Sequence, residues 1–385
     1  MKIQSWYHEN FENRLAGRYI TLAHISKILD DYKTTYQISV AGHSEEGLPI
    51  PLLKIGNGPK VVLGWSQMHG NESTTTKAVF DFLKFLGQDD CFQSEIETFL
   101  NTYTFYLIPI LNPDGAKRYT RENANGIDLN RDAVNLSQSE SVCLRNVFQE
   151  VKPQLCLNLH DQRSIFGFDN GSPATVSFLS PAADKERSLT KARITAMEQI
   201  VKMNKMLQAI IPGQVGRYDD SFNMNCVGDT FQKMGVPTIL FEAGHYLQDY
   251  KREQTRAFVF YALISLFDVF TKTPAVDYKM YFDIPENRKN YNDFVLKNAV
   301  LEGAVAPVNI AIQYVERLRG DNIELDAVVD KIGQFKNRFG HLEKNVNKAK
   351  ILTNTDDKLT VGGNISEIYD KTNDLVVFSS HKLLL

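Results

Sequence analysis

The sequence has little of what marks a membrane-spanning or disulfide-stabilised protein. Its four cysteines form no C-x-x-C motif, and three of them lie in apolar settings, which predicts reduced cysteines in the core. The longest apolar stretch, residues 257–270, is interrupted by Asp268 and is shorter than the roughly 20 residues that cross a bilayer. This stretch is typical of a buried helix.

An export signal and an excess of one charge are also missing. The N-terminal residues include charges and aromatic rings where a signal peptide has an apolar core, so we expect a cytoplasmic protein. The mature form of an exported protein is the alternative. The net charge is −3, with acidic and basic residues interspersed, which gives no reason to expect nucleic acid or a membrane as partner. Small or peptidic partners remain open, and the sequence does not give the oligomeric state.

The chain is long enough for one large domain with an appendage, or for two domains. Up to about residue 274, apolar strand-like runs alternate with helix-like stretches, which indicates an α/β sheet covered by helices on both faces. The clearest strands are residues 60–67, 103–111, 155–160 and 237–244, and the clearest helices are 79–86, 188–211 and 257–270. Beyond this point the chain has strand-like pieces with turn signals at 308–329, 349–363 and 374–380. We therefore predict an α/β domain over residues 1–274 and a small β-rich domain over 275–385.

Polar side chains follow the predicted strands at the points where they end. His69 and Glu72 come after one strand, and His160 ends another. Ligands bind at the carboxyl ends of strands in open α/β sheets, so these residues can converge. Two histidines and a carboxylate are a common ligand set for catalytic zinc, with the fourth position left for water. Taken singly, the His-x-x-Glu pair could be a polar turn, and His160 could be a hydrogen-bonded residue at a strand end.

Candidates for a base and for a carboxylate-binding group also occur, although Glu242 alone could be a salt-bridged residue at a strand end. Glu242 ends a mostly apolar strand, where a carboxylate is costly unless it is paired or functional. The loop over residues 120–134 contains Arg121, Asn130 and Arg131, whose donors are suited to holding a carboxylate. Any one of these arginines alone would be an ordinary polar loop residue.

In this order, the motifs resemble those of the zinc carboxypeptidase family of metallopeptidases. They are His69-x-x-Glu72, the NPDG run at 112–115, Arg121, the GIDLNRD run at 126–132, His160 and Glu242. The likeness covers residues 35–270 and includes a predicted hairpin at 42–56. It implies a mixed eight-stranded sheet between helices and one Zn²⁺ ion.

The resemblance also implies a role for each matching residue. It matches three residues to the zinc ligands: His69, Glu72 and His160. Glu242 matches the general base that activates the zinc-bound water and then protonates the leaving amine. Arg121 matches the arginine that polarises the scissile carbonyl. Asn130 and Arg131 match the pair that binds the C-terminal carboxylate of the substrate.

The chain departs from the family pattern in two places. Tyr218 is the nearest counterpart of the family's mobile tyrosine, which closes over the substrate, but other alignments are open. The segment after His160 differs from that of the digestive members, and we hypothesise that Asp161 or Arg163 recognises a polar or anionic substrate.

Further expectations concern the turn and the other histidines. Gly70 and Asn71 are expected to form the bend that turns both ligands inward, and the run 73–76 to cap the following helix. His245 is assigned to the surroundings of the site or to packing. Surface roles are expected for the remaining histidines, which are His8, His24, His43, His341 and His381.

The leading functional hypothesis is a metallocarboxypeptidase that cleaves a C-terminal amino acid from a peptide. The alternatives are a deacylase of N-acyl amino acids on a similar scaffold, and a murein-peptide amidase as a subtype. A binding module without catalysis is a third class, although it would be expected to have lost a ligand or the base. In each enzymatic case the substrate carries a free carboxylate.

Overall fold

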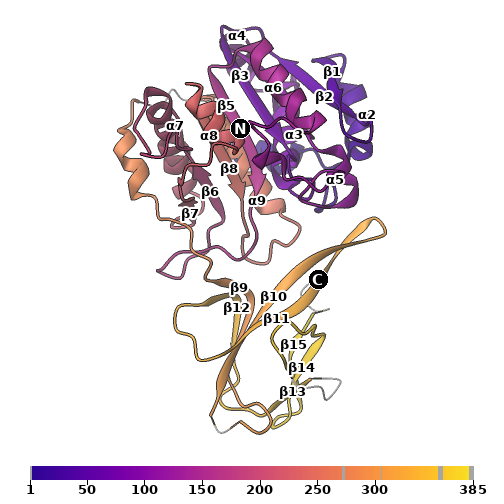
Figure 1. The fold of residues 1–385 in the computed structure, drawn as a ribbon, viewed down its shortest axis with the longest axis vertical. Helices are drawn as coiled ribbons and strands as arrows, with labels where there is room; N and C mark the ends of the chain where they lie inside the picture. Colours follow the sequence, from indigo (N-terminus) through magenta and orange to yellow (C-terminus); the bar gives the residue numbers. More distant parts are fainter. Residues whose placement is uncertain (1, 271–273, 305, 354–358, 381–385) are drawn as a thin grey trace. The chain divides into compact units, whose positions relative to one another are not determined.

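The structure is a computed structural model that describes residues 2–270, 274–304, 306–353 and 359–380. The chain forms two compact units (Figure 1). The first comprises Met1–Gln162, Thr175–Gly244 and Lys251–Glu286, and the second Arg163–Ala174, His245–Tyr250 and Asn287–Leu385. The second unit therefore includes two segments from within the predicted α/β domain over residues 1–274, and the first unit continues past residue 274.

An eight-stranded mixed sheet forms the centre of the first unit, in the order β1-β2-β4-β3-β5-β8-β6-β7. Its strands are β1 (Gln37–His43), β2 (Pro49–Ile55), β3 (Lys60–Ser66), β4 (Tyr103–Ile108), β5 (Leu155–Asp161), β6 (Val176–Leu179), β7 (Val215–Arg217) and β8 (Thr238–Ala243). The four central strands β4, β3, β5 and β8 are parallel. On one side β2 is antiparallel to β4 and to β1, and on the other β6 is antiparallel to β8 and parallel to β7. The predicted mixed eight-stranded sheet is confirmed.

The central strands are buried because other strands and helices surround them. β3 lies between β4 and β5, and its residues Val62, Leu63 and Trp65 are at most 2% exposed. A parallel strand covered on both faces is a nearly continuous apolar run, which is the pattern that the sequence shows there.

Helices cover both faces of the sheet, as expected (Figure 1). α6 and α8 pack on one face, where Leu144 and Phe231 join a buried cluster with Leu63 and Trp65. At the other face α9 packs against both α3 and α7, and all three helices contact the central strands. The helices and 3₁₀ turns of the unit are α1 (Ile3–Asn10), α2 (Leu22–Tyr32), α3 (Thr74–Leu86), α4 (Gln93–Thr102), α5 (Pro113–Arg118), η1 (Leu129–Arg131), α6 (Ser139–Val151), α7 (Lys191–Gln208), α8 (Val227–Lys233), α9 (Glu253–Leu266) and η2 (Tyr278–Asp283).

The apolar stretch at 257–270 lies mostly in α9, which is buried as predicted. Within the described part of the chain, none of the helices has both the length and the apolar character needed to cross a membrane.

The second unit is rich in β-structure, as expected. A four-stranded sheet has the order β11-β10-β9-β12, and a three-stranded sheet the order β13-β14-β15. The strands are β9 (Tyr291–Ala299), β10 (Val308–Arg319), β11 (Asn322–Gly333), β12 (Phe339–Asn345), β13 (Ile351–Thr353), β14 (Glu367–Asp370) and β15 (Leu375–Ser379). The predicted strand-like piece at 349–363 falls partly outside the described residues.

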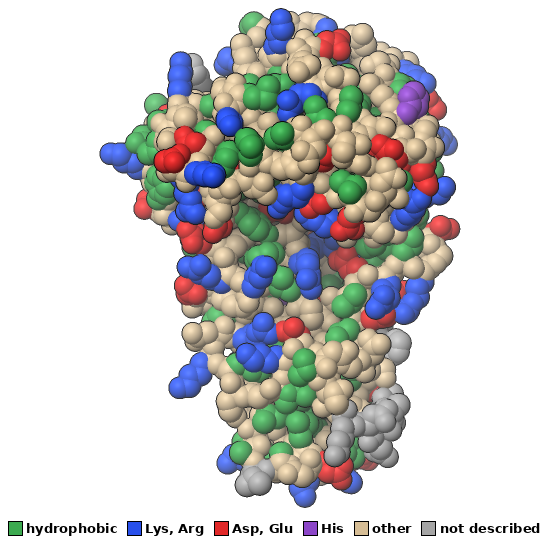
Figure 2. Space-filling model, in the orientation of Figure 1, with side chains coloured by type: hydrophobic (Ala, Val, Ile, Leu, Met, Phe, Trp, Pro, Cys, Tyr) green, Lys and Arg blue, Asp and Glu red, His purple; other side chains and the backbone are tan. Residues whose placement is uncertain are grey.

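The face shown in Figure 2 carries acidic and basic side chains intermixed, with hydrophobic side chains scattered among them.

Candidate metal centre

The parallel central strands bring the predicted site residues to one edge of the sheet. His69 follows the end of β3, His160 lies in β5 and Glu242 in β8. In the register between β5 and β8, His160 is the direct neighbour of Glu242. Side chains alternate between the two faces along a strand, and residues in register on neighbouring parallel strands point to the same face. The side chains of His160 and Glu242 therefore point to the same face of the sheet.

The turn that carries His69 is fixed by the segment after β4. Asn112 Nδ2 donates to the carbonyl of Met68 at 3.2 Å, while Asn112 Oδ1 accepts from the N–H of Gly115 at 2.8 Å. Gly70 lies against the same segment, since a Cβ on it would lie 2.0 Å from the carbonyl carbon of Gly115. Any side chain at Gly70 would therefore separate the two backbones, which explains the glycine at the expected bend.

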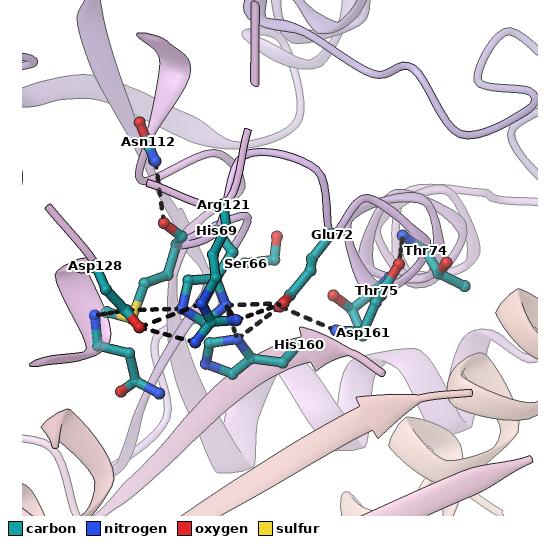
Figure 3. Close-up of polar contacts among 12 residues, drawn as sticks. Ser66, His69, Glu72, Thr74, Thr75, Asn112, Arg121, Asp128, His160 and Asp161 are labelled. Carbon is teal, nitrogen blue, oxygen red and sulfur yellow. Dashed lines mark hydrogen bonds and ion pairs between the residues drawn. The ribbon is translucent and has the colours of Figure 1, made fainter. Parts of the chain in front are cut away.

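His69, Glu72 and His160 point toward one another (Figure 3), and their candidate ligand atoms all lie within 4.8 Å. His69 Nδ1 is 2.8 Å from Glu72 Oε1, and His160 Nδ1 is 2.8 Å from Glu72 Oε2. The two Nδ1 atoms are 3.1 Å apart. Atoms that share a tetrahedral zinc ion at about 2 Å lie roughly 3.3 Å from each other. The spacing and the nitrogen and oxygen donors therefore fit one Zn²⁺ ion.

Asp128 and Arg121 extend this cluster. Asp128 Oδ1 lies 3.0 Å from His69 Nε2, and Asp128 Oδ2 accepts from Arg121 Nη2 at 2.9 Å. A carboxylate on Nε2 favours the tautomer with its hydrogen there, which leaves the lone pair of His69 Nδ1 for a metal. Arg121 Nη1 also lies 3.3 Å from Glu72 Oε1.

The two glutamates of the site have opposite electrostatic settings. Burial alone would raise the pKa of Glu72, but the imidazoles of His69 and His160 hold it below its usual range. Burial, followed by the charges of Glu72 and Asp161, raises the pKa of Glu242 well above its usual value, while Arg121 opposes the rise. The charged form of Glu72 is thus favoured, as it must be in a ligand, whereas the affinity of Glu242 for a proton is higher than that of an exposed glutamate.

A family model described as zinc carboxypeptidase matches residues 21–256, which is more than half of the chain. The chain belongs to the zinc carboxypeptidase family. The resemblance inferred from the motifs is thereby confirmed. Carboxypeptidase E of Caenorhabditis elegans is 30% identical over 152 residues, a match that covers 34% of this chain and 31% of that protein. The chain spans about a third of the length of this relative. An activity like that of the relative is therefore only proposed for this chain.

Solved structures of the same fold include a metallo-carboxypeptidase from Burkholderia cenocepacia, with a TM-score of 0.53 and 17% identity over 65% of this chain and 69% of that one. A second is the metallo-carboxypeptidase from Pseudomonas aeruginosa in complex with (2-guanidinoethylmercapto)succinic acid. Its TM-score is 0.52 and its identity 17%, over 64% of this chain and 68% of that one. At these identities the likeness concerns the fold.

In this member of the zinc carboxypeptidase family, Asn130 and Arg131 lie in the short turn η1, directly after Asp128. Asn130 is 8% exposed, and its Oδ1 accepts from the N–H of Val227 at 3.3 Å, which leaves Nδ2 as its donor for a ligand. The side chain of Arg131 is exposed, and its Nη1 donates to the carbonyl of Asn130 at 2.7 Å. Their predicted role in binding a carboxylate stays a prediction.

The expectation that Asp161 recognises substrate is wrong. The side chain of Asp161 is 2% exposed, and its carboxylate accepts from the N–H groups of Thr74 at 2.9 Å and Thr75 at 3.2 Å (Figure 3). Asp161 therefore caps α3, the helix that starts two residues after Glu72. The expected cap from the run 73–76 is also wrong, because the Ser73 hydroxyl donates instead to the carbonyl of Arg18.

Other predicted positions have mixed outcomes. His341 is 8% exposed, so its predicted surface role is wrong, and His245 is 2% exposed and packs against aromatic rings. His8, His24 and His43 are exposed as expected, and His381 lies outside the described residues. Arg163 is exposed and belongs to the second unit, and the half-buried Tyr218 directly follows β7. Their predicted contacts with substrate stay predictions.

Asp128 is the site residue whose role the motifs did not predict. It lies in the polar loop over residues 120–134, and its carboxylate touches both a candidate ligand and Arg121. Its position two residues before Asn130, within the GIDLNRD run, was the feature of the sequence that could have indicated a role in the site.

Proposed function

We propose that this chain is a zinc-dependent carboxypeptidase, which hydrolyses the last amide bond of a peptide with a free C-terminal carboxylate. The observation that carries the proposal is the placement of Glu242 beside His160 in neighbouring parallel strands, at the edge where His69 and Glu72 also lie. A ligand set and a carboxylate whose affinity for a proton is raised by burial then stand at one place.

His69, Glu72 and His160 would hold one Zn²⁺ ion. Bound there, zinc would polarise a carbonyl oxygen and lower the pKa of a water molecule. Glu242 would take the proton from the attacking water and give it to the leaving amine. Its Oε2 is buried and has no hydrogen-bond partner among the described residues, so a lone pair is available for that proton.

Arg121 is suited to stabilising the oxyanion that develops on the scissile carbonyl. Its guanidinium already lies against Glu72 and Asp128, and a substrate oxygen would take up one of its donors. Asn130 Nδ2 and the exposed guanidinium of Arg131 would bind the substrate carboxylate by paired hydrogen bonds. Tyr218 would close over the bound substrate.

The decisive variant is Glu242→Gln, which keeps the size of the side chain and removes the base. We expect the variant to retain about one equivalent of zinc while turnover falls roughly 10²–10⁴-fold. The exposed Glu97 on α4, changed to glutamine, serves as the matched control and should leave both quantities unchanged. Near-normal turnover by Glu242→Gln would refute the mechanism.

A substrate panel separates the candidate reactions. Peptides that differ in the last residue should lose that residue, and the same peptides with a C-terminal amide should be poor substrates. A chelator should abolish the reaction and added zinc should restore it. Preference for N-acyl amino acids would indicate the deacylase instead, and preference for cell-wall peptides the murein-peptide amidase. Absence of zinc and of activity on every substrate would support a binding module.

A further inference from the structure

Two connections that leave the catalytic strands are folded into the second unit. Residues 163–174 begin three positions after His160, and residues 245–250 begin three positions after Glu242. Both belong to the compact unit formed by Asn287–Leu385 rather than to the unit that contains the sheet. The strands that carry a candidate zinc ligand and the candidate base therefore both continue directly into the second unit.

The first connection is held by hydrogen bonds along its backbone. The carbonyl of Ser164 accepts from His341 Nε2 at 2.7 Å, and its hydroxyl oxygen accepts from Gln313 Nε2 at 2.8 Å. Further along, the carbonyl of Ile165 accepts from the N–H of Tyr291 at 3.1 Å. Ser164 is only four residues from His160, so this anchoring begins close to the end of β5.

The same connection fits closely against β9. Gly167 exchanges two backbone hydrogen bonds with Arg288, at 3.0 and 2.8 Å. A Cβ on Gly167 would lie 2.2 Å from the ring of Tyr291, whose hydroxyl donates to the carbonyl of Gly171. The segment therefore has one well-defined path over the strand, with no room for a side chain at its closest approach.

The second connection, residues 245–250, is held by contacts between aromatic side chains. The imidazole of His245 lies 4.3 Å from that of His341 and 4.6 Å from the ring of Tyr250, measured between centroids. Tyr250 in turn packs against Tyr314 of β10 at 5.3 Å. His341 thus touches both connections, because it donates to Ser164 and packs on His245.

The anchoring residues are themselves fixed within the second unit. Gln313 donates to the fully buried Asp293, which also accepts from the N–H of Tyr314 at 2.7 Å. Gln313 Oε1 accepts from Asn292 at 3.2 Å. Buried polar groups joined in this way hold one arrangement of side chains, so the two connections are attached to a rigid support.

We propose that His341 and Gln313 are positioning residues, through which the second unit holds the ends of the strands that carry His160 and Glu242. This gives the β-rich C-terminal part a role in the reaction without placing any of its residues on the substrate. The catalytic consequence rests on the proposed function, whereas the structural consequence does not.

The test uses the full chain with His341→Ala and His341→Phe. Backbone amide exchange reports on the connections directly. His341→Ala should raise exchange about tenfold or more in both 163–174 and 245–250. His341→Phe keeps a ring against His245 and should loosen only 163–174. In the peptidase assay, His341→Ala should lower kcat about tenfold to 100-fold and change KM by less than about threefold, with zinc still bound.

Two further variants keep the test decisive. Ser164→Ala removes the hydroxyl that accepts from Gln313 and should raise exchange in 163–174, even if His341→Ala fails to fold. Ile368→Val alters the buried face of β14, which pairs with β13 and β15 and with neither connection. Unchanged exchange in both connections would overturn the proposal, as would equal effects from Ile368→Val. If wild-type protein cleaves no substrate, the proposed function fails while the exchange measurements still decide this inference.

Discussion

Three aspartate carboxylates near the site differ in function because they differ in their partners. Asp128 touches His69 and Arg121, Asp161 binds the first amides of α3, and Asp114 accepts from the hydroxyl of Ser44 at 2.9 Å. Only the first of these three contacts a candidate zinc ligand with its side chain. Residue type and position in a motif did not distinguish them, since Asp114 and Asp128 lie in the two family motifs and Asp161 directly follows His160.

At the same scale, the burial of Asp229 in α8 predicts that the free energy of unfolding depends on pH. It is 5% exposed, and burial raises its pKa to about 6, against the hydrogen bond from the N–H of Asn223. A raised carboxyl pKa means that the folded state binds more protons between about pH 4 and 6. Stability therefore falls as pH rises through this window, and the loss is complete above it.

Asp229→Asn should remove this loss while keeping an oxygen for Asn223. We expect the variant to be more stable than wild type by about 1–3 kcal/mol at pH 7.5, with a clearly smaller difference at pH 4.5. Urea unfolding at the two pH values measures this. The exposed Asp283, changed to asparagine, is the control. A gain for Asp229→Asn that is equal at both pH values would contradict the assignment.

At the scale of elements, the contact between Asp161 and α3 joins the two halves of the ligand set. His160 and Asp161 end β5, while Glu72 precedes α3, and the N–H of Asp161 also donates to Glu72 Oε2 at 3.2 Å. The helix N-terminus carries partial positive charge, so a carboxylate there is favourable. One residue therefore sets the spacing between β5 and the turn that supplies the other ligands.

Asp161→Ala should weaken both the helix and the metal site. Loss of the cap is expected to cost about 0.5–2 kcal/mol of stability, and displacement of the ligands to lower zinc affinity about tenfold or more. Urea unfolding and competition with a chelator measure the two effects. Ser73→Ala, on the same turn, should leave zinc affinity unchanged because its hydroxyl bonds Arg18. Wild-type zinc affinity in Asp161→Ala would show that the cap does not position the ligands.

The elements that could be predicted from sequence are those whose burial leaves a long apolar run. β3, β5 and β8 were recognised in this way, and the three candidate ligands and Glu242 followed from their ends. β6 and β7, with four and three residues, are too short for a periodic pattern. The cap of α3 was predicted from the adjacent Ser73–Thr76 run, but it comes from Asp161, 87 residues from Thr74. A local pattern does not contain such long-range contacts.

At the scale of the whole molecule, the chain passes repeatedly between its two units. The crossings lie at 162/163, 174/175, 244/245, 250/251 and 286/287. The three candidate ligands all lie in the first unit. Residues 163–174 and 245–250 belong to the second unit, although in the sequence they lie between segments of the first unit. We therefore expect global unfolding of the first unit to pull these residues out of the second.

Zinc should therefore stabilise the whole chain rather than the first unit alone. At a free concentration of 100 times its Kd, a ligand that binds only the folded state adds about 2.7 kcal/mol. We expect chelation to lower the thermal midpoint and to speed amide exchange in β9 and β10 as well as in β3 and β5. Glu72→Gln should remove both responses to zinc, since it removes a charged ligand. If zinc slowed exchange in the first unit alone, the two units would unfold independently and the expected coupling would be refuted.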